Sequence, residues 1–241
     1  MNDGNMTPAR AKRPMLYPLA FAIFGILLAA RESSTFAHWF EIIPILGGNI
    51  PFFTLAMLLA YAYCANGGSL ATIGLRWPSW NGRRPLLVLY VLLAALLIFA
   101  ARAGVALTVN PLVSDLGPLP SAMERMAPLI GNFRLLLVLL PVMWLAVIGE
   151  ELLFRGLLLN FFASRFGGNT GAWLAAIVVS ALIFGIGHFW QGPRGMILTG
   201  AGALVYGAGY YLSGRNLWPP ILAHAIANTL GFVSIYMGDT G

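Results

Sequence analysis

Two adjacent carboxylates, Glu150 and Glu151, interrupt an otherwise apolar run of the sequence, LLLVLLPVMWLAVIGEELLFRGLLLNFF, and Arg155 follows four residues after the second. A charged side chain at the centre of a membrane helix costs roughly 2.5–3.5 kcal/mol, so such residues face the interior of a helix bundle and mark function. These three residues are therefore the first candidates for a site that does chemistry.

The helical spacing separates the roles of the two glutamates. Glu151 and Arg155 are four residues apart, so they share a helix face and can pair, which keeps Glu151 ionised and fixed. Glu150 points about 100° away, toward the face of Phe154, because successive residues of an α-helix turn by that angle. We therefore expect Glu150 to be the carboxylate available as a general base or acid. A structural alternative stays open, in which the charged cluster only fixes helix packing.

Two histidines also lie in apolar segments, His188 in SALIFGIGHFW and His224 in PPILAHAIANTL. Asn228 shares a helix face with His224, and Phe184 shares one with His188, because each pair is four residues apart. An asparagine side chain buried beside a histidine can donate to an oxyanion. We expect both histidines and the asparagine to meet the unpaired glutamate in one site. A lone histidine in such a helix is more often a packing residue, and the third, His38, is expected at the surface.

The composition places these residues in a membrane protein. Hydrophobic residues make up 59% of the 241 residues and charged residues only 9%, where a soluble domain carries roughly 25% charged residues. The mean hydropathy is +0.80. This composition excludes a soluble enzyme and a disordered chain. A nucleic-acid-binding protein is excluded as well, because the basic residues form no stripe. The single cysteine, Cys64, allows neither an internal disulfide nor a cysteine-based metal cage.

The fold class that follows is an all-α bundle of about seven membrane-spanning helices, each close to the roughly 20 apolar residues that a bilayer requires. The expected spans are 15–37, 50–66, 86–109, 133–160, 171–190, 195–212 and 218–237. We divide the chain into a cytoplasmic tail (1–14), an N-terminal group of helices and surface loops (15–132), a catalytic core (133–237) and a C-terminal tail (238–241).

Three further expectations concern orientation and packing. A cytoplasmic N-terminus puts eight basic residues inside and four outside, which follows the positive-inside rule. The inside set is Arg10, Lys12, Arg13, Arg76, Arg83, Arg84, Arg165 and Arg215, and the outside set is Arg31, Arg125, Arg134 and Arg194. The loop 67–85 suits a membrane-surface anchor, with substrate recognition as its alternative. Small residues in 195–212, including the pairs Ala203/Gly207 and Gly209/Ser213, favour a close helix–helix approach.

Three motifs resemble those of a known family. EELLFR (150–155), FGIGH (184–188) and HAIAN (224–228) look like the EExxxR, FxxxH and HxxxN motifs of the CPBP family, the CAAX prenyl endopeptidases and bacteriocin-processing intramembrane proteases, also called the ABI family. The resemblance covers roughly residues 133–230, and the first 130 residues match only as generic membrane spans.

The resemblance implies peptide-bond hydrolysis inside the membrane, on a membrane-anchored or lipidated protein or peptide. Glu150 and His188 would activate water, and His224 and Asn228 would stabilise the oxyanion. Glu151, Arg155 and Phe184 would support the site. The expected partners are that substrate and the lipid bilayer, with no nucleic acid. The expected location is the inner membrane of a prokaryote.

Metal dependence has two possible answers at this stage. Glu150, His188 and His224 would make an acceptable catalytic zinc site with water as the fourth ligand. We favour a metal-free glutamic mechanism with no cofactor, because a ligating histidine usually gives its other nitrogen to a carboxylate or carbonyl. The only other buried carboxylate, Glu151, is expected to be committed to Arg155, which leaves Asn228 to orient His224.

Two functions other than proteolysis stay open. One is a non-catalytic immunity or chaperone protein that keeps the fold, although packing alone would not require the complete set of polar residues. The other is a proton-coupled transporter, in which glutamate and histidine relay protons. Transporters usually carry repeats with broken helices in both halves. The buried polar residues of this chain are expected only in its last 110 residues, which disfavours transport.

Overall fold

The computed structural model describes residues 49–76, 84–117, 124 and 126–238, and all regular secondary structure in this part of the chain is helical. The expected all-α fold is confirmed. The long helices are α3 (Asn49–Ala65), α4 (Arg84–Leu112), α6 (Phe133–Glu151), α8 (Thr170–Ile186), α9 (Gly192–Leu212) and α10 (Trp218–Tyr236). Shorter elements are η1 (Ser114–Leu116), η2 (Ala127–Leu129), η3 (Leu152–Leu159), α7 (Asn160–Arg165) and η4 (Phe189–Gln191). The expected span 15–37, His38 and residues 77–83 of the expected anchor loop lie outside the described residues.

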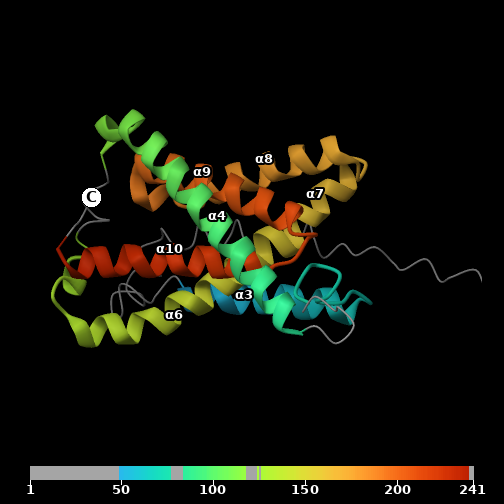
Figure 1. Cartoon of the computed structure of the whole chain (residues 1–241), viewed down its shortest axis with the longest axis horizontal. Helices are drawn as coiled ribbons and strands as arrows, with labels where there is room; N and C mark the ends of the chain where they lie inside the picture. Colours follow the sequence, from blue (N-terminus) through green and yellow to red (C-terminus); the bar gives the residue numbers. More distant parts are fainter. Residues whose placement is uncertain (1–48, 77–83, 118–123, 125, 239–241) are drawn as a thin grey trace, which may run out of the picture.

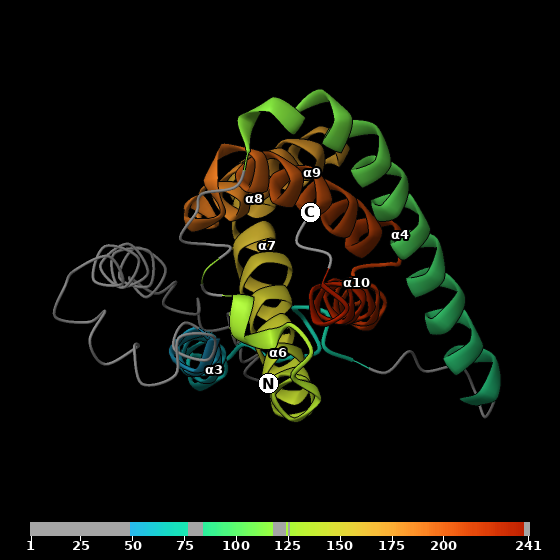
Figure 2. The ribbon, with the colours of Figure 1, turned by 90° about the vertical axis from the view of Figure 1, so that its left-hand side faces the viewer.

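The helices form two stacked groups, α3, α6 and α10 in one and α8 and α9 in the other. The long helix α4 contacts both groups. In Figure 1, α6 and α10 run side by side along the length of the molecule, and α3 packs against α6. The α8–α9 pair lies over them, and Figure 2 shows α4 passing along the outer side of both α9 and α10. The helices that carry the three motifs therefore face one another at the centre.

Within the described residues, fewer helices are candidates for membrane spans than the sequence predicts. Two continuous helical stretches of this part of the chain are long and apolar enough to cross a bilayer, Leu86–Leu112 and Phe133–Arg165. The pair Thr170–Ile186 and Phe189–Leu212 is bent by 57° and counts as a third only if it is one broken span. The expectation of about seven spans is thus not confirmed. The apolar part of α3, Phe52–Ala65, is too short for a regular span.

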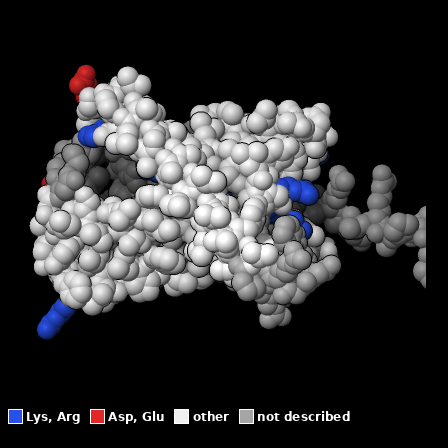
Figure 3. Space-filling view, in the orientation of Figure 1, with Lys and Arg blue, Asp and Glu red and all other residues white. Residues whose placement is uncertain are grey.

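The surface agrees with insertion into a membrane. Leucines such as Leu89, Leu93 and Leu97 lie exposed on one face of α4, at 51%, 51% and 72%. In Figure 3 the visible charged side chains lie mainly toward the two ends of the long axis, and the middle of this face is apolar. An apolar belt between charged ends matches the environment of a bilayer.

Directly after the two glutamates the chain changes from an α-helix to a π-helix, η3. The i→i+5 hydrogen-bond pattern of a π-helix is rare in proteins, and where it occurs it is often at a functional site. In a membrane every backbone polar group must be satisfied within the protein, and side chains supply donors here. Ser180 Oγ donates to the carbonyl oxygen of Phe154 at 3.3 Å. Asn160 Nδ2 donates to the carbonyl oxygens of Arg155 at 3.0 Å and Gly156 at 2.7 Å.

Small residues let α9 approach its neighbours closely, as expected. A Cβ added at Gly185 of α8 would lie 2.8 Å from the carbonyl oxygen of Met196 and 3.1 Å from Cα of Gly200. A Cβ at Gly209 would lie 2.5 Å from a side-chain carbon of Ile98 in α4. Larger side chains at these positions would push α8 and α4 away from α9.

The chain before α10 enters the interior of the bundle. Leu217 is fully buried and its N–H donates to the carbonyl oxygen of Gly74 at 2.9 Å. Pro219 and Pro220 follow in the first turn of α10, where a missing N–H costs nothing, and both are fully buried. This inward path starts α10 deep enough for His224 to reach the level of the glutamates.

Candidate active site

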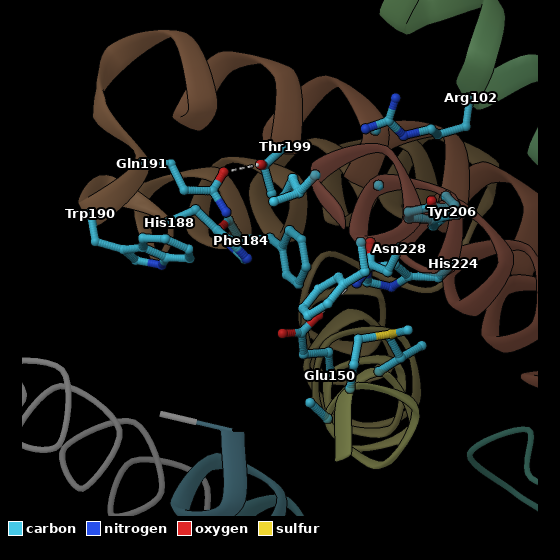
Figure 4. Close-up of a pocket in the computed structure, with 18 of the residues that line it drawn as sticks. Arg102, Glu150, Phe184, His188, Trp190, Gln191, Thr199, Tyr206, His224 and Asn228 are labelled. Atoms are coloured by element: carbon cyan, nitrogen blue, oxygen red, sulfur yellow. Dashed lines mark hydrogen bonds and ion pairs between the residues drawn. The ribbon is translucent and has the colours of Figure 1, made fainter. Parts of the chain in front are cut away.

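A cavity of about 370 Å³ lies between α4, α6, α8, α9 and α10. The four residues expected to be catalytic all line it. Glu150 comes from α6, His188 follows α8, and His224 and Asn228 come from α10. Figure 4 shows Glu150 below His224 and Phe184, with His188 on one side of the cavity. The fold thus brings together residues that are up to 78 positions apart, from 150 to 228.

The expected pair of Glu151 and Arg155 is present. Arg155 Nη1 lies 3.0 Å from Glu151 Oε1, and both side chains are buried, at 2% and 0% exposure. Arg155 Nη2 also donates to the carbonyl oxygen of Ala203 at 3.3 Å. Its guanidinium lies over the ring of Phe184, 4.7 Å from the centroid. Arg155 therefore ties Glu151, at the end of α6, to α8 and α9.

His224 changes the expected role of Glu151. His224 Nδ1 lies 2.8 Å from Glu151 Oε1, so the same carboxylate oxygen accepts from both Arg155 and the imidazole. On its other side, His224 Nε2 lies 3.7 Å from Glu150 Oε2. The expectation that Glu151 is committed to Arg155 alone is therefore wrong. It fails because helix spacing reports neighbours within one helix and not those on a facing helix.

His188 is held by the end of its own helix. Its Nδ1 donates to the carbonyl oxygen of Phe184 at 2.8 Å, which makes Nε2 the basic nitrogen of the neutral ring. Phe184 is the shared aromatic contact of the site. Its ring centroid lies 4.6 Å from that of His188 and 6.2 Å from that of His224. The ring of Phe184 thus lies in contact with the imidazole rings of both histidines.

Asn228 lines the cavity one helical turn after His224. It makes no hydrogen bond within the described part of the chain. The expectation that Asn228 orients His224 is not met, since Glu151 accepts from His224 Nδ1. The amide is available to a molecule in the cavity, which is what an oxyanion donor requires.

Several cavity residues were missed by the sequence analysis. Tyr206 stacks on His224 at 4.7 Å between centroids with a 20° interplanar angle. Gln191 accepts a hydrogen bond from Thr199 at 3.1 Å (Figure 4). The buried polar side chains of the described residues all lie in the last 110 residues, as expected, and the half-buried Arg102 reaches the cavity from α4. The available signal was Arg102 itself, a charged residue in the otherwise apolar segment 86–109.

The residues do not form a metal centre as they are placed. Among the described residues, no three His, Cys, Asp or Glu side chains lie close enough together to hold a metal ion. The premise used against zinc is nevertheless wrong, because both histidines give Nδ1 to an oxygen, Glu151 for His224 and the carbonyl of Phe184 for His188. That arrangement also suits metal ligands.

Comparison with known proteins identifies the family of the central region. Residues 132–230 match the Rce1-like family model, described as Type II CAAX prenyl endopeptidase Rce1-like. The resemblance seen in the motifs is confirmed, and this region is an Rce1-like domain of the CPBP family, which indicates a membrane protease of the CAAX type. The helices α3 and α4 lie outside the match. No curated protein and no solved structure matches the chain significantly.

Proposed function

We propose that this protein is an intramembrane endopeptidase that hydrolyses a peptide bond in a membrane-anchored or lipidated protein or peptide. The observation that carries the proposal is the position of His224 between two carboxylates, with Nδ1 2.8 Å from Glu151 and Nε2 3.7 Å from Glu150. His188 and Asn228 line the same cavity. General acid–base chemistry requires such titratable groups in one water-accessible site.

In the proposed reaction Glu150 is the general base. It takes a proton from a water molecule whose oxygen attacks the scissile carbonyl carbon, and His188 shares that proton through Nε2. The tetrahedral intermediate then collapses, the C–N bond breaks, and Glu150 returns the proton to the leaving nitrogen. The products are a carboxylic acid and an amine, so one water molecule is consumed and no other reactant is needed.

The hydrogen bond to Glu151 determines what His224 can do. Because His224 Nδ1 donates to Glu151, Nε2 carries a proton only when the ring is an imidazolium. We propose that His224 acts as this imidazolium, with Glu151, which Arg155 contacts, as the partner of Nδ1. Its Nε2–H faces Glu150 before the reaction. When Glu150 accepts the proton from water and loses its charge, this N–H becomes available to the oxyanion, together with the amide of Asn228.

We propose this mechanism without a metal or other cofactor, and zinc held by Glu150, His188 and His224 is the alternative. Elemental analysis of the purified protein distinguishes the two. The metal-free mechanism predicts no stoichiometric metal and full activity after prolonged chelation. One bound metal per chain, with activity lost on its removal and restored on its return, would overturn it and make Glu150 a ligand.

The test of the proposed function is cleavage by the purified protein in liposomes. A prenylated peptide is the probe, its fragments are identified by mass spectrometry, and the Glu150→Ala variant is the control. Cleavage by the wild type and not by the variant supports the proposal. Binding of the peptide without cleavage would favour the non-catalytic immunity or chaperone function.

We also propose that residues 133–237 are the catalytic core and that the N-terminus faces the cytoplasm of a prokaryote. The support for this orientation is the excess of basic residues in the segments that would lie inside. A reporter fused to the N-terminus tests it: a cytoplasmic reporter should be active there, and a reporter that works only outside the membrane should be silent.

A further inference from the structure

The orientation of the His224 ring decides where its second nitrogen points. Nδ1 lies 2.8 Å from Glu151 Oε1, and Nε2 lies 3.7 Å from Glu150 Oε2. The χ2 torsion of a histidine has broad minima, unlike the staggered torsions of an aliphatic side chain. A hydrogen bond tolerates a wide range of angles, so the bond at Nδ1 restrains this torsion only loosely. A flat surface packed against the imidazole would restrain it more tightly.

Tyr206 of α9 provides such a surface. Its ring centroid lies 4.7 Å from that of His224, with 20° between the two planes, which is the geometry of a stacked aromatic pair. Tyr206 is only 3% exposed, so the surrounding protein holds its ring in place. Phe184 approaches the same imidazole edge to face, at 6.2 Å and 71°. Rotation of the imidazole out of its plane would therefore bring it into collision with Tyr206.

Tyr206 is in turn held from α4. Arg102 makes a side-chain hydrogen bond to the hydroxyl of Tyr206. It packs on α9 at Gly202, where an added Cβ would lie 3.4 Å from Arg102 Nε. Gly202 is four residues before Tyr206 and so shares its helix face, and its missing side chain leaves space for the arginine. Figure 4 shows Tyr206 between Arg102 and His224.

An aromatic ring also suits the charges at this position. In the proposed reaction His224 is an imidazolium, and the face of an aromatic ring attracts a cation. The guanidinium of Arg155 lies 5.5 Å from the same ring centroid. A carboxylate in place of Tyr206 would compete for the Nε2–H of His224. The tyrosine ring stabilises the cation through its face and leaves that N–H available to the oxyanion.

We propose that Tyr206 is a positioning residue for His224: its ring holds the imidazole in the plane that directs Nε2 into the cavity, and Arg102 holds the ring. The proposal rests on the proposed protease function. Groups that act in a reaction need to be held within about 0.5 Å and about 10–20° of the productive geometry, and a misplacement of about 1 Å can cost about 10²-fold in rate. Tyr206 lies in none of the three motifs.

The first experiment measures kcat and KM for cleavage of a prenylated peptide in liposomes. Tyr206→Leu removes the flat ring and should lower kcat about 10- to 100-fold, with little change in KM. Tyr206→Met fills the space with a flexible side chain and should behave alike, which covers the case that the leucine variant does not fold. Tyr206→Phe keeps the ring, loses only the bond to Arg102, and should keep kcat within about 3-fold of the wild type.

Tyr211→Leu is the matched control. Tyr211 is half-buried on the same helix and stacks on Trp173 at 5.4 Å and 29°, away from the residues that line the cavity. The variant thus removes a stacked tyrosine ring from α9 without touching His224. It should lower the midpoint of thermal unfolding and leave kcat unchanged.

The second experiment follows the His224 ring without any cleavage. It records ¹⁵N NMR spectra of protein labelled at histidine, in detergent, with His224→Gln identifying the signals of this residue. The Nδ1–H that is bonded to Glu151 should give one narrow signal in the wild type and in Tyr206→Phe. Tyr206→Leu should broaden or split this signal, because the ring then takes several orientations.

Wild-type kcat in Tyr206→Leu would overturn the proposal, and so would an equal loss in Tyr206→Phe, which would assign the effect to the hydroxyl. A rise in KM at constant kcat would make Tyr206 a substrate contact instead. If the wild type cleaves no peptide, it is the protease function that fails. An unchanged His224 signal in Tyr206→Leu would then overturn the positioning role independently.

Discussion

Replacing Arg155 with alanine should destabilise the protein as well as inactivate it. The guanidinium is buried at 2% exposure, bonds Glu151 Oε1 at 3.0 Å and donates to the carbonyl oxygen of Ala203 at 3.3 Å. Its removal leaves Glu151, fully buried, with only His224 as a donor, because Glu151 Oε2 already has no hydrogen-bond partner among the described residues. The variant therefore strands a charge in an apolar interior.

The expected size of the effect follows from that stranded charge. Breaking a buried ion pair by truncating one partner costs roughly 3–5 kcal/mol. The lost contact over Phe184, at 4.7 Å, adds about 0.5–2 kcal/mol, the range for cation–π pairs. For a chain of this size each kcal/mol lowers the midpoint of thermal unfolding by roughly 2–4 °C. The midpoint should thus fall by about 7–28 °C.

The assay is thermal unfolding of the purified protein in detergent, followed alongside peptide cleavage. Arg165→Ala is the matched control, because Arg165 is an exposed arginine at the end of the same helical stretch; a change within about 0.5 kcal/mol is expected there. The double variant Glu151→Gln with Arg155→Met removes both charges and should recover part of the lost stability. An Arg155→Ala protein that is fully stable yet inactive would refute the reasoning and make Arg155 a substrate or transition-state contact.

Four further predictions follow from the site. Asn228→Ala should lower kcat about 10²–10³-fold, as expected for a lost oxyanion donor, with little change in KM; a large rise in KM at constant kcat would assign it to substrate binding. Asn160→Ala removes a donor from two carbonyls of η3 and should cost about 1–3 kcal/mol in thermal unfolding. Asn66→Ala, at an exposed helix end, should cost little, and equal effects would contradict the role given to the partly buried amide of Asn160. Activity should survive prolonged chelation, and metal-dependent recovery would contradict this. The ascending limb of the pH–rate profile should move in His188→Gln, because in the proposed mechanism Glu150 and His188 share one proton; an unchanged limb would contradict that sharing.

The sequence was sufficient to predict the all-helical fold and that Glu150, His188, His224 and Asn228 would share one site, because the cost of polar groups in an apolar segment is a strong signal. Glu150, Glu151 and Arg155 stand out in a run that is otherwise almost free of charge. Contacts within one helix, such as that of Glu151 with Arg155, follow from the spacing of residues along the chain.

Contacts between helices could not be predicted in the same way. The hydrogen bond between His224 and Glu151 joins α10 to α6, and it depends on how deeply the segment ending in Pro219 and Pro220 enters the bundle. The π-helix after Glu151 also has no simple sequence signature, because it depends on hydrogen bonds from another helix. The carbonyl oxygen of Phe154, for example, accepts a hydrogen bond from Ser180 of α8. The expected number of spans is not confirmed within the described residues, because hydropathy detects apolar segments but not a bend such as the 57° one between α8 and α9.

The most direct test of the central claim is the effect of Glu150→Gln on peptide cleavage. This variant keeps the size of the side chain and removes its ability to act as a base. Wild-type protein in liposomes should cut a prenylated peptide into two fragments, with one oxygen atom from labelled water in the new carboxylate. Glu150→Gln should fold with the same midpoint of thermal unfolding and show cleavage reduced by at least about 10²-fold, the lower end of the range for general-base catalysis. Cleavage by Glu150→Gln at the wild-type rate would contradict the account.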